Sequence, residues 1–228
     1  MDVDDVSNVS QYTHILKTQH KILKNAITRE GELPTDRKTR GEVIRKHQMF
    51  SMQATNPRQS TQQGAQIYSS FLPPPYPPST TSLNELTPIY IKDLKLGIHH
   101  RGSYLLIRSV TSPNRMTAII VVVEDERDDA IVLQLFQQPD EDVQPASSIV
   151  TIGDVFLIKE PFLKLMADGE YGLRVDHVSD ILRVDAGHRM WSNRWSPHQP
   201  SLDRTPDDLK QEGNLAMRRK QHWAAIRR

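Results

Sequence analysis

The 228-residue chain contains no cysteine, so disulfides, thiolate metal ligands and a cysteine nucleophile are excluded together. Aromatic residues make up only 6% of the chain and hydrophobic residues 37%, while 15 residues are proline. We therefore expect much of the chain to lie outside a packed core. The formal net charge is +1, which gives no overall attraction to nucleic acid or to acidic membranes.

Long apolar runs are also missing. No segment approaches the roughly 18 apolar residues that span a bilayer. The first residues, Met1 to Asp5, are acidic and contain no apolar stretch of the kind found in secretory signals. We therefore expect no membrane contact and a cytoplasmic or nuclear location.

Recognisable catalytic motifs are absent as well. The sequence has no glycine-rich phosphate loop and no Gly-x-Ser-x-Gly elbow. His99 and His100 are adjacent, so an extended chain would point them to opposite faces, which is poor geometry for one metal. The carboxylates of Gly153–Asp154 and Asp168–Gly169 occupy turn pairs without an identifiable partner. We expect no catalytic residue, no metal and no cofactor in this chain.

Composition and periodicity divide the chain into five parts. Apolar residues recur at helical spacing over 7–29 and, more weakly, over 37–54. These helices either dock on another surface or are solvated helices with one modest apolar stripe. The five parts are a helical N-terminal extension (1–54), a disordered linker rich in Gln, Ser and Pro (55–82), a β domain (83–186), a second linker (187–204) and an incomplete helical repeat (205–228).

The first linker ends in a proline run that favours extended polyproline II. Within it, Pro73, Pro74 and Tyr76 fit the Pro-Pro-x-Tyr pattern that the aromatic grooves of WW domains bind. Such short matches arise readily by chance in proline-rich segments, so a plain linker is the alternative.

The region 83–186 predicts a mainly β domain. Ile131, Leu133 and Leu135 alternate and should share one face of a strand. Only a short helical opportunity lies between the third and fourth strands, which favours a small five-stranded Greek-key barrel of the OB type. Another small antiparallel barrel or a sandwich is the alternative. The five expected strands cover residues 102–110, 116–123, 130–136, 155–159 and 171–175.

The C-terminal residues predict a helix that starts at Pro206. Leu209, Gly213 and Met217 follow at four-residue spacing, and the glycine suggests close approach by a second helix that carries Ala225. This order resembles the opening of a tetratricopeptide (TPR) repeat, a helix-turn-helix unit that needs neighbouring repeats for stability. We expect the chain to be part of a longer TPR protein; a single amphipathic helix that folds back on the β domain is the alternative.

Lys210 and Asn214 lie one helical turn apart on the same helix. In some TPR proteins, a lysine and an asparagine at these positions of the first repeat hold the terminal carboxylate of a bound peptide. An ammonium group and an amide on one side of a helix can bind one carboxylate. The resemblance thus implies a peptide-binding pair and protein or peptide partners; ordinary surface residues are the alternative.

A second resemblance extends from about Leu83 to Arg228. It is similar to the N-terminal region of fungal proteins that continue into TPR repeats and then a SET domain, which implies a lysine methyltransferase module and its cofactor S-adenosylmethionine in a longer protein. No SET segment is present, so we expect this chain to be non-catalytic and to act as a protein-interaction module. The segments that carry the resemblance are 88–97, 123–125, 158–162, 164–169 and 171–178.

An OB-type barrel also raises single-stranded nucleic-acid binding as an alternative function. Such barrels combine a basic groove with aromatic rings on which bases stack. The acidic stretches 124–129 and 140–142 largely cancel the basic residues, so we expect this function less than protein binding. The candidate residues are Arg101, Arg108, Arg115, Lys159, Lys164 and Arg174, with Tyr104, Phe136, Phe156 and Tyr171 as rings.

Overall fold

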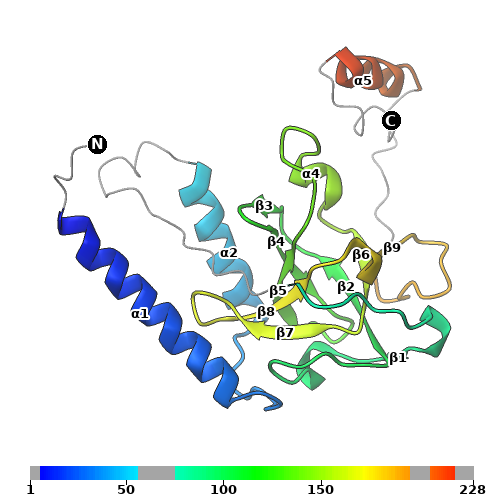
Figure 1. Cartoon of the computed structure of the whole chain (residues 1–228). Helices are drawn as coiled ribbons and strands as arrows, with labels where there is room; N and C mark the ends of the chain where they lie inside the picture. The colour runs from blue at the N-terminus through cyan, green and yellow to red at the C-terminus, as the bar shows by residue number, and fades with distance from the viewer. Residues whose placement is uncertain (1–5, 56–74, 196–205, 219–228) are drawn as a thin grey trace.

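The computed structural model describes residues 6–55, 75–195 and 206–218. Two helices precede the sheet and lie on one side of it (Figure 1). α1 spans Val6–Thr28 and α2 spans Arg40–Thr55, close to the predicted helices. Thr39 and Glu42 form a capping pair in which the Thr39 backbone N–H donates to the Glu42 carboxylate at 2.9 Å, which fixes the start of α2.

A mixed sheet of nine strands forms the body of the described chain. Its order is β7-β8-β5-β4-β2-β6-β9, with β1 paired to β2 and β3 paired to β4. The pairs β1–β2 and β5–β8 are parallel and the others are antiparallel. The strands are β1 (Thr87–Pro88), β2 (Ser103–Ser109), β3 (Asn114–Arg115), β4 (Ile119–Glu124), β5 (Ala130–Leu135), β6 (Val155–Lys159), β7 (Phe162–Leu165), β8 (Tyr171–Val175) and β9 (Ile181–Val184).

The sheet curls into a barrel because one long strand bends at Glu160. This residue has a φ of 47°, in the left-handed region, and it separates β6 from β7. The far edge of β7 then accepts hydrogen bonds from the segment before β2: Gly97 N–H donates to Leu163 O at 2.8 Å and His100 N–H to Pro161 O at 3.2 Å. The β7 end of the curled sheet therefore closes against the segment before β2.

The mainly β prediction is confirmed, but the prediction of five strands is wrong. The strand expected over 155–159 does not end there, because the chain bends at Glu160 and continues as β7. The other additional strands, β1, β3 and β9, have at most four residues, too few to show an alternating pattern. A short helix, α4 (Ala146–Ile149), lies between β5 and β6, where a helix was expected.

The main core fills the barrel interior. Ile131, Leu133 and Leu135 are all buried there, which confirms the predicted alternation on β5. A smaller core lies on the outer side of β2, β6 and β9, where Trp195 packs against Leu106 and Val184. Burial of Trp195 means that residues 187–195, predicted as linker, pack against the barrel.

Residues 75–82 also differ from the disordered linker expected for them. They follow the barrel surface, and Ser79 is buried with its backbone N–H donating to Asp180 at 2.9 Å. The Thr81 hydroxyl donates to Glu160 at 2.9 Å. A proline-rich segment is already extended, so it loses little conformational entropy when barrel carboxylates bind its backbone.

The C-terminal helix α5 spans Pro206–Arg218, as predicted. Residues 219–228, where the second helix of a TPR unit was expected, lie outside the described residues. The TPR interpretation therefore stays a prediction. Within the described part of the chain, no helix has the length and apolar character needed to cross a membrane.

Candidate functional site: a groove between α1, α2 and the barrel

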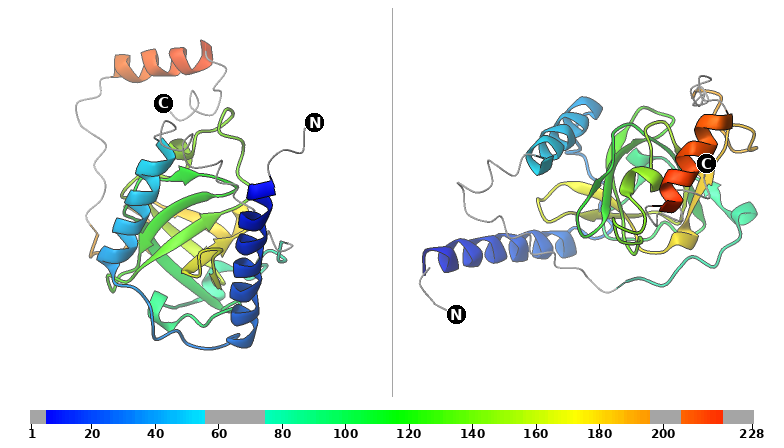
Figure 2. Two further views of the ribbon diagram at one scale, coloured as in Figure 1. Left: turned by 90° about the vertical axis from the view of Figure 1, so that its left-hand side faces the viewer. Right: turned by 90° about the horizontal axis from the view of Figure 1, so that it is seen from above.

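A groove of about 880 Å³ lies where α1 and α2 approach the outer face of β4, β5, β7 and β8. Figure 2 (left) shows the two helices on either side of this sheet face, with the strands between them. Because side chains alternate along a strand, the inward residues fill the core while the outward ones form the groove floor. Floor residues include Ile120, Val132, Gln134 and Phe136.

One wall of the groove is α1. Ile22 and Ala26 face the barrel and pack against its core. Leu23 and Ile27 also line the groove but stay 37% and 71% exposed. The helix therefore presents apolar side chains that its own barrel does not cover.

The other wall is α2, which is fixed to the barrel by polar contacts. Arg40 donates to the fully buried carboxylate of Glu124 at 2.6 Å. His47 is buried, with Nε2 3.0 Å from Ser112 O, and burial lowers the pKa of His47. These contacts fix α2 at its start and at its middle, and Phe50 then faces the groove.

Gly172 of β8 leaves room on the groove floor for the side chain of Met166. A Cβ atom at Gly172 would lie 2.8 Å from the sulfur of Met166, closer than such contacts occur. The absence of a side chain therefore lets Met166 lie across β8. Met166 is a flexible thioether in the lining, a residue type that adapts to irregular partners.

Most cations of the groove have carboxylate partners. Lys46 donates to Asp168 at 2.8 Å and to Glu170 at 2.9 Å, and Lys38 also pairs with Glu170. Lys164 differs: among the described residues no carboxylate forms an ion pair with it. Burial, followed by the nearby charge of Arg174, lowers the pKa of Lys164 to about 8.

A cluster of rings closes one end of the groove. His99 stacks on Phe162 with ring centroids 4.6 Å apart, and Tyr76 meets His99 edge-on at 4.3 Å. The Tyr76 hydroxyl donates to Arg174 O at 3.1 Å and accepts from the Asp176 N–H at 3.1 Å. Burial raises the pKa of Tyr76 to about 12.

Tyr76 is also the tyrosine of the predicted WW-binding pattern. The structure holds its ring against the barrel, so a WW domain would have to detach it first. Pro73 and Pro74 lie outside the described residues. The WW interpretation remains a prediction, and binding would also require the free energy needed to detach the Tyr76 ring from the barrel.

The predicted peptide-binding pair, Lys210 and Asn214, is exposed on α5. Met217 is 54% exposed and Gly213 is half-buried. Leu209 lies in α5, but its side chain is not described, and Ala225 lies outside the described residues. The structure therefore brings no second helix against these positions within the part of the chain that it describes.

The predicted nucleic-acid residues do not form one surface. Arg101 pairs with Glu160, and Arg108 pairs with Glu124. Lys159 donates to the backbone of Ser79 at 3.3 Å. Only Lys164, Arg174, Phe136 and Tyr171 of the predicted set line the groove.

Sequence reasoning missed the groove itself. One signal was present: β4 is almost continuously apolar, the pattern of a strand that is covered on both faces. The helices that provide this cover were identified, but their docking face was left open. Among the described residues, no group of three or more His, Cys, Asp or Glu could hold a metal ion.

Comparison with known proteins finds a relative that aligns with the whole of this chain. No protein-family model matches the chain. A protein of Gibberella zeae named methyltransferase is 35% identical over 227 residues, which cover 100% of this chain and 29% of the relative. The expectation that the chain is not an enzyme is therefore wrong, because the relative that matches it throughout is named as an enzyme. The chain spans 29% of the length of that relative, whose name mentions neither TPR repeats nor a SET domain.

Three solved structures show weaker likeness. Schizosaccharomyces pombe Pot1pC bound to single-stranded DNA is 15% identical, with a TM-score of 0.31 over 49% of this chain and 91% of that one. Fission yeast Pot1 with single-stranded DNA is 14% identical, with a TM-score of 0.31 over 41% and 39%. The S. pombe Stn1–Ten1 complex is 12% identical, with a TM-score of 0.28 over 53% and 76%.

Proposed function

We propose that the chain is part of a methyltransferase and that its groove binds an apolar protein segment. The observation that carries this proposal is the groove, whose apolar wall residues Leu23 and Ile27 are left exposed by the barrel. Exposed apolar surface of this kind marks an interaction site more often than it marks a solvated face. A methyltransferase could use such a groove to hold its substrate protein or another part of its own polypeptide.

The strand order supports a barrel of the OB type. Taking β6 and β7 as one bent strand, the five main strands follow the closed order β2-β4-β5-β8-β7, with α4 between the third and fourth. In OB barrels the face of the second and third strands binds oligonucleotides or oligosaccharides. Here that face belongs to β4 and β5, and it forms the floor of the groove.

The chemistry of this face favours protein over nucleic acid. Its outward residues Ile120 and Val132 are apolar, and α2 covers part of it. Single-stranded nucleic acid needs cations that neutralise phosphates. Lys38 and Lys46 are already paired with acids. Nucleic-acid binding is therefore one outcome of the test below rather than the proposal.

S-adenosylmethionine, the methyl donor implied by the SET resemblance, carries a sulfonium, an ammonium and a carboxylate group. The groove lining holds the cations Lys38, Lys46, Lys164 and Arg174 and the acids Glu30, Asp168 and Glu170, of which Asp168 and Glu170 are already paired with Lys38 and Lys46. We therefore assign no methyl-donor site and no chemical step to the groove residues.

The finer family assignment is also part of the proposal. Helix α5 supports a TPR array in the longer protein. In that array, Lys210 and Asn214 would bind a carboxylate. The name of the relative supports a methyltransferase, and we propose the SET type. A cytoplasmic or nuclear location would suit such an enzyme.

The test is peptide binding by the full chain. We expect a fluorescein-labelled, leucine-rich amphipathic 15-residue peptide to bind, measured by fluorescence anisotropy. The Leu23→Ser and Ile27→Ser variants should weaken binding about fivefold each, because the removed groups line the groove. Leu16→Ser is the matched control, because Leu16 is 54% exposed on the same helix but does not line the groove.

A single-stranded DNA 20-mer provides the opposing outcome. Absence of peptide binding, or equal weakening by Leu16→Ser and Ile27→Ser, would overturn the proposal. Salt-dependent DNA binding that is lost on Lys164→Met would favour the nucleic-acid function instead.

A further inference from the structure

Two cations share one aromatic ring at the groove floor. The Lys164 ammonium lies 5.8 Å from the centroid of the Phe136 ring, and the Arg174 guanidinium lies 5.4 Å from the same centroid. The register of β7 and β8 explains the arrangement, since Lys164 pairs with Gly172 and Phe162 with Arg174. Lys164 and Arg174 are thus diagonal neighbours on the outward face.

Only one of these two cations has a counterion. Arg174 makes a bidentate pair with Asp176, at 2.7 Å from Nε and 2.6 Å from the terminal nitrogen. Asp176 also accepts the Tyr76 backbone N–H at 3.3 Å. Its two oxygens are therefore engaged, and its charge acts on Lys164 without a direct ion pair, so the ammonium group lies over the ring with no carboxylate bound to it.

Occupancy of the groove would change the surroundings of Lys164. An apolar segment that fills the groove removes water from the Lys164 ammonium group and supplies no hydrogen-bond acceptor to replace that water. A buried charge without a partner is strongly unfavourable, and a lysine over an aromatic ring still retains its hydrogen-bond donors. A segment that fits must therefore bring an acceptor, and the strongest acceptor for an ammonium group is a carboxylate.

We propose that Lys164 binds a side-chain carboxylate of the protein segment that occupies the groove, so that the groove selects amphipathic segments with an acidic residue. This inference rests on the proposed function, because it names the chemistry of the segment that the groove binds. Charge complementarity is the argument for this occupant: the other groove lysines, Lys38 and Lys46, already have acids, and Lys164 alone among the three described ones does not.

The experiment uses pairs of amphipathic peptides that differ only in one residue. Each pair carries either Glu or Gln at one of four successive positions along the edge of the apolar stripe, and all peptides are amidated. We expect at least one Glu peptide to bind the full chain about tenfold tighter than its Gln partner, because a charge-assisted hydrogen bond is gained. In the Lys164→Met variant the preference should vanish while the Gln peptide still binds.

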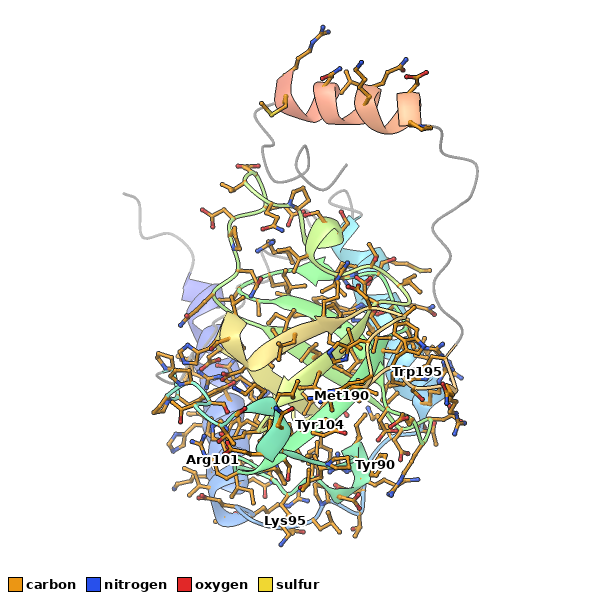
Figure 3. The ribbon with its side chains drawn as sticks, turned by 90° about the vertical axis from the view of Figure 1, so that its right-hand side faces the viewer. Tyr90, Lys95, Arg101, Tyr104, Met190 and Trp195 are labelled. Carbon is orange, nitrogen blue, oxygen red and sulfur yellow. The ribbon has the colours of Figure 1, made fainter. Side chains whose placement is uncertain are left out.

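Two variants separate the role of charge at this position from general effects. Lys164→Arg keeps the charge and should keep part of the preference. Lys95→Met removes one positive charge from an exposed lysine that is labelled in Figure 3 and does not line the groove, and this variant should keep all of the preference. Thermal unfolding of each variant checks that the fold is intact.

The outcomes are distinguishable. If neither peptide binds, the proposed function fails and this inference fails with it. If Glu and Gln peptides bind equally, the groove stands but the assignment to Lys164 is overturned. A Gln peptide made with a free C-terminal carboxylate is the last comparison. If it binds tighter than its amidated form while no amidated Glu peptide binds tighter than its Gln partner, the bound group is a chain terminus and the side-chain assignment is overturned.

Discussion

The two outer faces of the barrel differ in how the chain covers them. On the outside of β2, β6 and β9, Trp195 is 2% exposed and completes a small core with Leu106 and Val184. Figure 3 views the molecule from this side, with Met190, Tyr104 and Trp195 labelled. On the outside of β4, β5, β7 and β8, the two N-terminal helices leave an apolar groove. Residues of the chain itself cover the face outside β2, β6 and β9. The face outside β4, β5, β7 and β8 is open to another segment.

The charged groups follow the same contrast. On the covered face, Arg108 lies 5.4 Å from the Trp195 ring and pairs with Glu124. On the open face, Lys164 lies over Phe136 without a carboxylate. Both sites place a cation over an aromatic ring, but Lys164 lacks the direct ion pair that Arg108 makes, whereas Arg174, over the same Phe136 ring, is paired with Asp176. The open face therefore holds one cation without a directly paired carboxylate, and a bound segment could supply that partner.

The largest expected change in the free energy of unfolding comes from removing Trp195 from the small core on the covered face. Trp195→Ala should lower the free energy of unfolding by about 4 kcal/mol, because it empties a buried site. Chemical denaturation measures the change. Leu182→Ala is the control: this residue of β9 is 40% exposed and should change stability by less than about 1 kcal/mol. Equal effects of the two substitutions would mean that the Trp195 face is not a core.

The next effect tests the ion pairs that join α2 to the barrel. Glu124→Gln should lower the free energy of unfolding by about 2 kcal/mol, because Arg40 and Arg108 both lose their charged acceptor. Urea denaturation measures it. In the control, Asp93→Asn, the exposed pair with Arg127 is lost and the change should stay below about 1 kcal/mol. A similarly small loss for Glu124→Gln would show that α2 docks without this pair.

Removing the unpaired charge should have the opposite sign. Lys164→Met should raise the free energy of unfolding by about 1 kcal/mol at pH 7, because a poorly solvated cation is replaced by an apolar group. The pKa of Lys164 is about 8 in the folded chain against 10.5 ordinarily, so the unfolded state binds more protons between these values. Stability of the parent chain should therefore gain from Lys164 as pH rises from about 8 to 10.5, and the variant should lack this gain.

The pKa of Lys164 also predicts how peptide binding depends on pH. The preference for Glu over Gln peptides should decrease above about pH 8, where the free Lys164 loses its proton. Denaturation curves and anisotropy titrations at several pH values measure both effects. A Lys164→Met variant that is less stable than the parent at pH 7 would contradict the role of an unpaired charge.

The smallest stability effect belongs to the open face. Ile27→Ser should change the free energy of unfolding by less than about 0.5 kcal/mol, because the side chain is 71% exposed. The same variant should weaken peptide binding about fivefold, measured by anisotropy. A large loss of stability with unchanged binding would show that Ile27 supports the fold instead of the groove.

The sequence predicted the individual strands better than their assembly. Alternation identified the buried face of β5, since Ile131, Leu133 and Leu135 differ clearly from their polar neighbours. The bend at Glu160 was not predictable, because its left-handed φ is imposed by hydrogen bonds from other parts of the chain. Its carboxylate accepts from Thr81 and Gly102, and its N–H donates to Ser103 O.

The groove could be predicted only in part, because two helices and four strands far apart in sequence form it. An amphipathic stripe on α1 and an apolar β4 were visible, but nothing local shows that they meet. Lys164 was identified as a basic residue of a possible nucleic-acid surface. Its lack of a partner is a property of the packed strands: Asp176 turns to Arg174, two residues away on the same strand edge.

The strap formed by residues 75–82 has a practical consequence for defining the barrel. Asp180 is 2% exposed and receives the backbone of Ser79, and Asp176 receives that of Tyr76, each across about a hundred residues of chain. A fragment cut at residue 83, the border suggested by composition, would strip both carboxylates of these donors and leave Glu160 without Thr81. A piece that starts at Pro75 retains these contacts, so residues 75–78, the described part of the proline run, belong to the folding unit that they precede.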